Sequence, residues 1–306
     1  MSEITFNNRV VIVTGAGNGL GKAYALEFAK RGAKVVVNDL GGSFDGEGAS
    51  SAAADVVVNE IKAAGGDAVA NYDSVEFGEK IVKTAIDAFG RVDIVINNAG
   101  FLRDASFAKL TDENWQAIQN VHLNGAYSVT KAAWPYMVEQ GFGRVIFTTS
   151  AAGIYGNFGQ ANYSSAKSAL LGLGKTLALE GGRKNIHVNV IAPIAGSRLT
   201  ETIWPEEVLR ATSPDYVVPL VVKLSSEDNQ ETGGVFEVGA SWFAKVRVER
   251  TKGYAFGVEN DVSAEDVASK WNEICDFTDA KSAESIVSTF HAVGEMVGLD
   301  LLNAKK

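Results

Sequence analysis

One feature near the start of the chain restricts the possible folds most. It is a buried-strand pattern followed by a glycine-rich turn and then by a helical pattern. Residues 9–13 read Arg-Val-Val-Ile-Val, which is typical of a buried strand. Residues 20–31 carry apolar side chains at helical spacing, and the turn between the two runs is Gly-Ala-Gly-Asn-Gly-Leu-Gly, residues 15–21. Such a turn lets the backbone approach a diphosphate and points the amides of the helix start at it, so the sequence predicts a nucleotide site here.

The turn itself supplies the first candidate binding residues, which are Gly15, Asn18, Gly19, Leu20 and Gly21. The pattern departs from G-x-G-x-x-G, because Leu20 stands where the last glycine is expected. A tight turn without a ligand is the alternative. The strand before and the helix after the turn favour the nucleotide interpretation.

Strand and helix patterns keep alternating along the chain. Further strand patterns occupy residues 34–38, 68–71, 92–96, 143–149, 186–191 and 235–238, and helical patterns occupy residues 52–64, 76–89, 112–140 and 161–180. Repeated β-α units of this length predict an α/β fold in which a doubly wound parallel sheet has helices on both faces. Ligands of such sheets bind at the carboxyl ends of the strands.

Polar residues follow three of these expected strands. Asp39 comes directly after the second strand, where a carboxylate accepts hydrogen bonds from an adenosine ribose and repels a 2′-phosphate, which favours NAD over NADP. Asp73 is a candidate for the adenine amino group. Asn98, Ala99 and Gly100 follow the fourth strand and are expected to form a wall against the cofactor. For each of these residues an ordinary turn-forming role is the alternative.

A tyrosine and a lysine four residues apart, Tyr163 and Lys167, lie on one face of an expected helix. A phenol titrates near pH ~10, and a fixed positive charge beside it lowers its pKa toward a useful range for a general base. Ser150 ends the fifth strand at the same edge of the sheet. Taken alone, the pair also fits an exposed helix surface with a solvated lysine, and Ser150 also fits a helix cap.

The composition excludes several other classes of protein. The chain of 306 residues has a net charge of −9, which argues against broad binding to nucleic acid or to an anionic membrane. The single cysteine, Cys275, rules out an intrachain disulfide, and the three histidines His122, His187 and His291 lack the spacing of metal ligands. No apolar run reaches membrane-spanning length and no secretion signal opens the sequence, so we expect a protein that is neither membrane-spanning nor secreted. The glycine-rich insertion at residues 41–48 has no assigned chemistry.

Four features occur in an order and at spacings that resemble the short-chain dehydrogenase/reductase family: Thr14-Gly15-x-x-x-Gly19-x-Gly21, Asn97-Asn98-Ala99-Gly100, Ser150 and Tyr163-x-x-x-Lys167. The resemblance covers about residues 6–240. It implies a seven-stranded Rossmann-type sheet, NAD as cofactor, no metal, and assembly into dimers or larger oligomers.

The resemblance also implies roles for individual residues. Ser150 would hold the substrate oxygen, Tyr163 would transfer the hydroxyl proton, and Lys167 would bind the nicotinamide ribose and keep the phenol acidic. Pro193, after the sixth strand, would contact the cofactor. His122 stands where the family commonly has an asparagine that helps to seat a water molecule next to the active-site lysine, so its part in proton relay is an open expectation.

Longer segments are similar to a narrower group, the (3R)-hydroxyacyl-CoA dehydrogenase modules of peroxisomal multifunctional enzymes: residues 38–42, 121–123, 153–163, 195–200 and 233–239. In that group a histidine at position 122 is expected. The implied reaction is NAD-dependent oxidation of a (3R)-3-hydroxyacyl-CoA to the 3-ketoacyl-CoA in fatty-acid β-oxidation. The alternatives are a ketoreductase or 17β-hydroxysteroid dehydrogenase with the same catalytic residues, and an NAD-binding sensor or scaffold without turnover.

We expect two domains, an NAD-binding domain at residues 1–240 and an extension at residues 241–306 that docks on the core or on a dimer partner. The extension begins with a locally basic stretch, residues 245–252, that is a candidate for CoA phosphates or else a solvated edge. Ser263 to Asp266 has the spacing of a capping box. By resemblance, we also expect a homodimer, a hydratase domain further along a longer natural protein, and a peroxisomal location, although this sequence carries no Ser-Lys-Leu signal.

Overall fold

The computed structural model describes residues 3–42, 48, 50–195, 205–283 and 285–302. The chain divides into two compact units, Met1–Lys245 and Val246–Lys306. The boundary falls five residues beyond the one expected from the sequence, because most of strand β8, Trp242–Val246, still belongs to the first unit, to whose sheet it pairs.

The first unit is built on an eight-stranded sheet with the order β3-β2-β1-β4-β5-β6-β7-β8. Its strands are β1 Val10–Thr14, β2 Lys34–Asn38, β3 Asp67–Asn71, β4 Ile94–Asn97, β5 Gly143–Thr148, β6 Ile186–Pro193, β7 Val235–Gly239 and β8 Trp242–Val246. The pairings from β3 through β7 are parallel. The expected doubly wound α/β fold is therefore confirmed, with one strand more than predicted.

The additional strand, β8, follows β7 through a two-residue turn at Ala240 and Ser241. Both turn residues have positive φ, +48° and +61°, which is the backbone of a tight hairpin whose twist matches that of its strands. Neither is glycine or asparagine, the residues that usually announce such a turn. The strand was missed for this reason, and because its mostly exposed side chains lack a buried-strand pattern.

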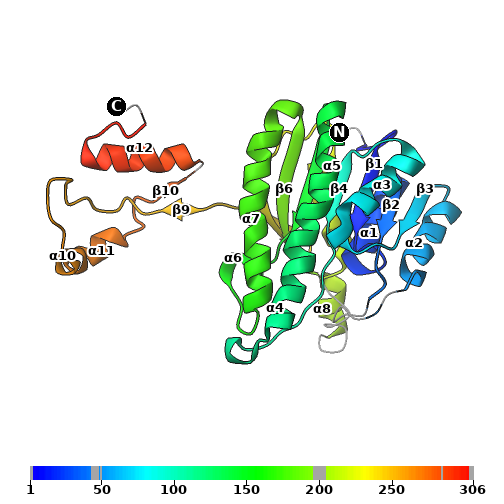
Figure 1. Cartoon of the computed structure of the whole chain (residues 1–306), viewed down its shortest axis with the longest axis horizontal. Coiled ribbons are helices and arrows are strands. Elements are labelled where there is room, and N and C mark those ends of the chain that lie inside the picture. The colour runs from blue at the N-terminus through cyan, green and yellow to red at the C-terminus, as the bar shows by residue number, and fades with distance from the viewer. Residues whose placement is uncertain (1–2, 43–47, 49, 196–204, 284, 303–306) are drawn as a thin grey trace. The chain divides into compact units, whose positions relative to one another are not determined.

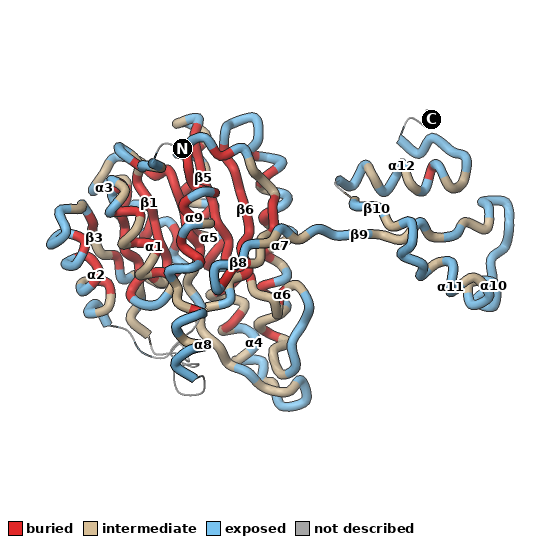
Figure 2. The backbone as a smooth tube through the Cα atoms, turned by 180° about the vertical axis from the view of Figure 1, so that it is seen from behind, coloured by how far each residue is buried: buried red, intermediate tan, exposed pale blue. Residues whose placement is uncertain are grey.

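Helices cover both faces of the sheet (Figures 1 and 2). The helices are α1 Gly19–Lys30, α2 Ala52–Ala63, α3 Gly78–Phe89, α4 Asp112–Gln119, α5 Ala126–Gln140, α6 Ala151–Tyr155, α7 Ala161–Gly181, α8 Glu206–Ala211 and α9 Val218–Ser225. Helix α1 packs between α2 and α9 on one face, while α3 packs on α5 and α7 on α4 on the other. The buried strands between them form the core (Figure 2). Tyr24 and Phe28 of α1 belong to the same buried cluster as Val11, Val13 and Val35.

The helix predicted at residues 112–140 is interrupted. Between α4 and α5 lies a π-helical turn, η3, at Asn120–Gly125. A π-helical turn holds one residue more than an α-helical turn, and such turns occur frequently at functional sites. The sequence pattern did not reveal this one, and it carries His122.

The described residues of the second unit, 246–283 and 285–302, form a two-stranded antiparallel ribbon and three helices. These elements are β9 Glu249–Arg250, β10 Lys281–Ser282, α10 Ala264–Ser269, α11 Trp271–Ile274 and α12 Ile286–Val297. The predicted capping box is confirmed, because the Ser263 hydroxyl accepts from the Asp266 backbone N–H while the Asp266 carboxylate accepts from that of Ser263. Within the described part of the chain, no helix is both long and apolar enough to span a membrane.

The parallel strands end at a common edge, which fixes the place of the site. Strand register pairs Thr14 of β1 with Asn38 of β2, and Asn97 of β4 with Phe147 of β5. The residues that follow these strands therefore emerge side by side at the carboxyl edge of the sheet.

Candidate active site

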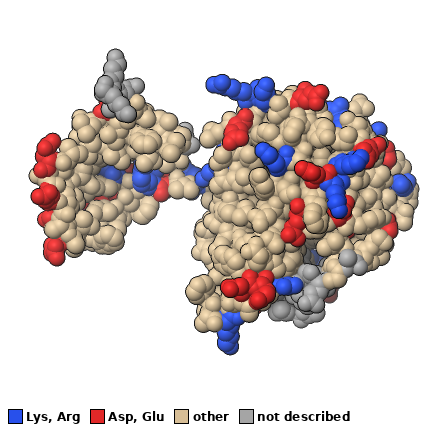
Figure 3. All heavy atoms as spheres, in the orientation of Figure 1, with Lys and Arg blue, Asp and Glu red and all other residues tan. Residues whose placement is uncertain are grey.

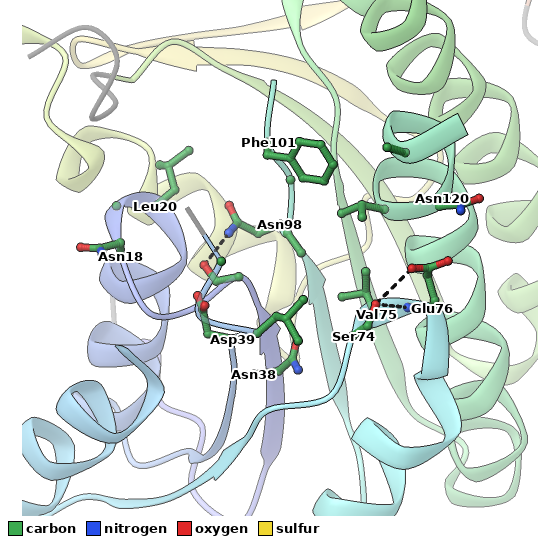
Figure 4. A pocket seen from close by; sticks show the side chains of 18 of the residues that line it. Asn18, Leu20, Asn38, Asp39, Ser74, Val75, Glu76, Asn98, Phe101 and Asn120 are labelled. Atoms are coloured by element: carbon green, nitrogen blue, oxygen red, sulfur yellow. Dashed lines mark hydrogen bonds between the residues drawn. The ribbon is translucent and has the colours of Figure 1, made fainter. Parts of the chain in front are cut away.

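A cavity of about 560 Å³ lies at this carboxyl edge (Figure 4). Nine of the residues predicted to bind the cofactor line it: Gly15, Asn18, Gly19, Leu20, Asp39, Asp73, Asn98, Ala99 and Gly100. Its other lining residues include Asn38, Val75, Glu76, Phe101, Arg103, Asn120 and Ala195. The predicted residues Gly21, Tyr163, Lys167 and Pro193 are not part of this lining.

The glycine turn is shaped by close packing as well as by its backbone conformation. Gly15 has φ +62°, and a Cβ on it would lie 2.7 Å from the Cα of Ala99. Gly21 packs on the carbonyl of Gly15, where a side chain would not fit. Leu20 is accommodated in the last position of the motif because its side chain borders the cavity (Figure 4). The bare backbone of this turn suits the approach of a diphosphate.

Asp39 directly follows β2, where it stabilises its own turn and also lines the cavity. Its Oδ1 accepts a hydrogen bond from the Gly41 N–H at 2.7 Å, so it caps its own turn. Its Oδ2 accepts from the Gly17 N–H at 2.8 Å, which ties it to the glycine turn, and the residue also lines the cavity. A carboxylate is thus fixed beside the phosphate-binding turn, as recognition of a ribose requires.

Asp73, the candidate for the adenine, also lines the cavity and belongs to a small polar network. Its Oδ2 accepts from Asn71 Nδ2 at 3.0 Å, and its backbone carbonyl accepts from Asn38 Nδ2 at 2.9 Å. Asn38 Nδ2 also donates to Asn71 Oδ1, at 2.8 Å. Buried amides therefore hold the second and third strand ends together at this edge.

The wall at residues 98–100 is held by Thr14, a residue that the sequence did not single out as a contact. Thr14 Oγ1 accepts from the N–H groups of Asn98 and Ala99 at 3.0 and 3.1 Å. Asn98 Nδ2, which borders the cavity (Figure 4), donates to the carbonyls of Thr14 and Gly15 at 3.0 and 3.1 Å. These bonds couple the wall to the glycine turn across two neighbouring strands.

The structure brings Ser150, just after the end of β5, together with Tyr163 and Lys167, which both lie on α7. Ser150 follows β5, and its Oγ accepts from the Ala152 N–H at 3.2 Å, so it also caps α6. Tyr163 lies in the first turn of α7, close enough to Ser150 for the serine side chain to lower the pKa of the phenol. Lys167 is one helical turn further on, and its Nζ lies 5.6 Å from the centre of the Tyr163 ring.

Burial dominates the electrostatics of this group. Burial raises the pKa of Tyr163; the Ser150 side chain opposes this, and the Asp104 carboxylate adds to it. Burial also lowers the pKa of Lys167 to about 7, with Nζ donating to the Thr148 carbonyl at 2.6 Å. Lys167 was expected to lower the pKa of the Tyr163 phenol, but in the protein alone this pKa is raised. The same burial that raises the phenol pKa also makes Lys167 easier to deprotonate.

His122 is buried on η3 directly beside Tyr163. The two rings meet edge to face with their centres 5.2 Å apart. His122 Nε2 lies 2.8 Å from the Phe101 carbonyl oxygen and 3.2 Å from the Phe101 backbone nitrogen, and the shorter contact favours the tautomer in which Nε2 carries the proton and donates. Nδ1 is then an acceptor, buried and without a hydrogen-bond partner among the described residues. Burial, followed by the charge of Lys167, lowers the pKa of His122 well below its usual value, so the ring is neutral.

Pro193 and most of two longer segments singled out in the sequence are not placed at the cavity by the described residues. Pro193 is the last residue of β6, and the cavity is lined two residues later by Ala195. Most of the segment at residues 195–200 and of the insertion at residues 41–48 lies outside the described residues. Among the described residues, no group of His, Cys, Asp and Glu is arranged to hold a metal ion.

This arrangement of a glycine turn, a strand-end serine and a paired tyrosine and lysine defines a class of protein. The chain belongs to the short-chain dehydrogenase family, whose model matches residues 9–206. The family and its dehydrogenase members imply a nicotinamide cofactor, and the cavity fits one, since it combines a bare phosphate-binding turn with a fixed carboxylate.

Within this family, the chain is similar to a smaller group of enzymes. The chain is 60% identical over 294 residues to "Peroxisomal multifunctional enzyme A" of Dictyostelium discoideum, covering 95% of this chain and 66% of that protein. It is 56% identical to "Peroxisomal multifunctional enzyme type 2" of Mus musculus, covering 97% of this chain and 40% of that protein. Full-length peroxisomal multifunctional enzyme type 2 from Drosophila melanogaster is structurally similar, with a TM-score of 0.83 and 39% identity over 96% of this chain and 50% of that one. The resemblance to this group is confirmed, and the chain spans 40 to 66% of these relatives' lengths.

Proposed function

We propose that this chain oxidises (3R)-3-hydroxyacyl-CoA to 3-ketoacyl-CoA with NAD. The observation that carries the proposal is the meeting of Ser150, Tyr163 and Lys167 at the carboxyl edge of a dinucleotide-type sheet, in a chain 60% identical to a peroxisomal multifunctional enzyme. The intact catalytic group argues against a sensor or scaffold without turnover.

The chemistry divides between cofactor and protein. The nicotinamide cofactor, held by the glycine turn, Asp39 and the wall at residues 98–100, supplies the acceptor for the hydride. Ser150 binds the substrate hydroxyl by a hydrogen bond. Tyr163, as the phenolate, takes the hydroxyl proton while the C–H bond of the same carbon gives up its hydride. Because burial raises the pKa of Tyr163, alkaline pH favours the oxidation direction.

Lys167 and His122 support this proton transfer. Lys167 is buried next to the Tyr163 ring and orients its ammonium through the Thr148 carbonyl. The Nδ1 atom of His122 is buried beside Tyr163 and has no hydrogen-bond partner among the described residues, so it can act as an acceptor. We assign it the part that the family commonly gives to an asparagine, which is to accept a hydrogen bond from a water molecule on the proton path next to Lys167.

NAD is the proposed cofactor rather than NADP because of Asp39. Its two oxygens are fixed by the N–H groups of Gly17 and Gly41, so the carboxylate cannot swing away from the cavity without breaking both bonds. A fixed negative charge at the ribose position repels a 2′-phosphate and accepts from a 2′-hydroxyl.

A homodimer is also proposed, and the surface of α5 and α7 supports it. Tyr127 and Tyr136 of α5 and Leu179 of α7 are exposed, Leu179 at 81%. Figure 3 shows few charged side chains over the middle of this face. Large exposed apolar side chains on neighbouring helices are typical of a subunit interface.

The remaining proposals concern location and the C-terminal part, and the relatives' names and lengths support only the first of them. We place the chain in the peroxisome, as a module of a longer enzyme that includes a hydratase. The basic stretch at residues 245–252 is proposed to attract CoA phosphates, although Lys245 also pairs with Glu231 at 2.8 Å and Arg247 with Glu249 at 2.5 Å. The domain at residues 241–306 is proposed to dock on the core or on the partner subunit.

The deciding experiment follows NADH absorbance at 340 nm with (3R)- and (3S)-3-hydroxyacyl-CoA as separate substrates. We expect turnover with the 3R form and little with the 3S form. Equal rates, or no turnover with the 3R form, would contradict the proposal. Competition between acyl-CoA and steroid substrates separates it from a hydroxysteroid dehydrogenase.

A further inference from the structure

One buried amide, that of Asn162, joins the proton-transfer residue to the wall of the cavity. Asn162 is fully buried in the first turn of α7, immediately before Tyr163. Its Nδ2 donates to the carbonyls of Arg103 and Asn114 at 3.0 and 3.3 Å. Its Oδ1 accepts from the Tyr163 N–H at 2.8 Å, so both ends of the amide are used.

The bond to Tyr163 matters because the start of α7 lacks any other side-chain cap. The first N–H groups of a helix have no partner within the helix. The residue before α7, Gln160, makes no capping bond with its side chain, and the Asn162 oxygen satisfies the Tyr163 N–H instead. The Asn162 carbonyl also accepts from Gln119 Nε2 at 2.9 Å, which anchors the same turn to α4.

The segments held by this amide carry the other half of the site. Phe101 and Arg103 line the cavity, and the Phe101 carbonyl fixes the ring of His122. Asn114 lies on α4, which continues into η3. Two further contacts join these segments: Gln160 Nε2 donates to Asp104 Oδ2 at 2.8 Å at an exposed position, and the half-buried Ala105 N–H donates to the Gly159 carbonyl at 2.9 Å. Of these tethers, only the Asn162 amide is fully buried and bonded directly to the Tyr163 backbone.

We propose that Asn162 is a positioning residue: it fixes the distance between Tyr163 and the cavity wall at residues 101–103, and thereby the geometry in which Tyr163 meets the substrate. The inference rests on the proposed dehydrogenase function. Misplacing a reacting group by about 1 Å can reduce the rate about a hundredfold without a change in the residues that react.

A matched control for Asn162 is Asn189, which lies in β6 of the same unit. Asn189 is also fully buried, and its amide likewise joins distant segments: Nδ2 donates to the Glu231 carbonyl at 2.8 Å, and Oδ1 accepts from the Gly234 N–H at 3.0 Å. These partners precede β7, so they lie at the opposite end of the strands from the catalytic group. Asn189→Ala therefore reproduces the loss of a buried amide without disturbing Tyr163.

The first measurement compares the steady-state kinetics of Asn162→Ala and Asn189→Ala. We expect Asn162→Ala to lower kcat about tenfold to a hundredfold while the Kd for NAD stays within about twofold. Asn189→Ala is expected to lower the Tm but to leave kcat within about twofold. If Asn162→Ala does not fold, Asn162→Ser is measured instead, because its hydroxyl can still meet the helix start but cannot reach the two carbonyls.

The second measurement, hydrogen exchange of residues 99–110, does not depend on activity. We expect this segment to exchange faster in the Asn162 variant than in the wild type, and at the wild-type rate in Asn189→Ala. An unchanged kcat in the Asn162 variant, an equal loss of kcat in both variants, or unchanged exchange at residues 99–110 overturns the inference. A wild-type protein without turnover would refute the proposed function, and the exchange result would then decide on Asn162 alone.

Discussion

Replacing Gly100 by alanine should disturb the catalytic group without touching any residue that reacts. A Cβ at position 100 would overlap the ring of His122, lying 2.8 Å from Nδ1 and 3.1 Å from Nε2. The ring has little freedom to retreat, because Nε2 is bound to the Phe101 carbonyl and the opposite side meets Tyr163. His122, Phe101 or the wall itself must therefore shift.

The size of the effect follows from the packing. Inserting a methyl group into a well-packed site costs about 1–3 kcal/mol. In a unit of this size each kcal/mol lowers the Tm by about 2–4 °C, so we expect a decrease of about 2–12 °C for Gly100→Ala. A lower kcat should accompany it, since His122 contacts Tyr163 directly.

Thermal unfolding and NADH production, measured on the same preparations, test this prediction. Gly172→Ala is the control: Gly172 is an exposed position of α7, and a Cβ there meets nothing within 4 Å. That substitution should stabilise the protein by about 0.5–1 kcal/mol, which is the opposite direction. In a His122→Ala background, Gly100→Ala should cost less than about 0.5 kcal/mol, because the clash is gone. A Gly100→Ala variant with wild-type Tm and kcat would refute the reasoning.

Three further predictions concern the catalytic group and the cofactor site. Tyr163→Phe should reduce turnover by about 10²–10⁴-fold, because no acid or base of suitable position replaces the phenol, while fluorescence titration should show a nearly unchanged Kd for NAD. Asp39→Ser should raise the ratio of kcat/KM for NADP over NAD by about tenfold or more, since the lost charge-assisted bond is worth about 1.5–3 kcal/mol; an unchanged ratio would contradict the role of Asp39. Lys167→Met should increase the Tm relative to wild type more at about pH 7 than at about pH 10. The folded-state pKa of Lys167, about 7, lies below the unfolded value, so the wild type loses stability as pH falls from the unfolded pKa through the folded one; an equal difference at both pH values would refute this.

The sequence was sufficient for most of the fold and for the residues of the glycine turn, because both depend on local patterns. Strand runs such as Val10–Thr14 and the glycines around Gly19 are recognisable from their neighbours in the chain. The π-helical turn at Asn120–Gly125 was not predicted, because a shift of one residue in the backbone hydrogen bonds leaves the apolar pattern almost unchanged. The strand β8 was missed because its turn uses alanine and serine.

The parts of the site that the sequence could not reveal depend on contacts between distant segments. The Asn162 side chain donates to the backbone carbonyl of Arg103, 59 residues away, and no local sequence pattern around Asn162 predicts this contact. From its spacing to Tyr163, Lys167 was expected to lower the pKa of the phenol; that burial lowers the pKa of Lys167 itself could not be read from the spacing. The candidate catalytic residues were therefore accessible from motifs, and their electrostatics were not.

The π-helical turn η3 also makes the chain sensitive to its length at one place. A helix turns by about 100° per residue, and η3 absorbs a single additional residue between α4 and α5. Removing one residue from Asn120–Gly125 would let an ordinary α-helix run through, with both flanking helices intact, yet His122 would point about 100° away from Tyr163 or be lost. In an alignment this would show as a one-residue gap. In an ordinary α-helix such a gap would rotate all following residues by about 100°, whereas here it would leave both flanking helices intact and mark the gain or loss of the histidine beside Tyr163.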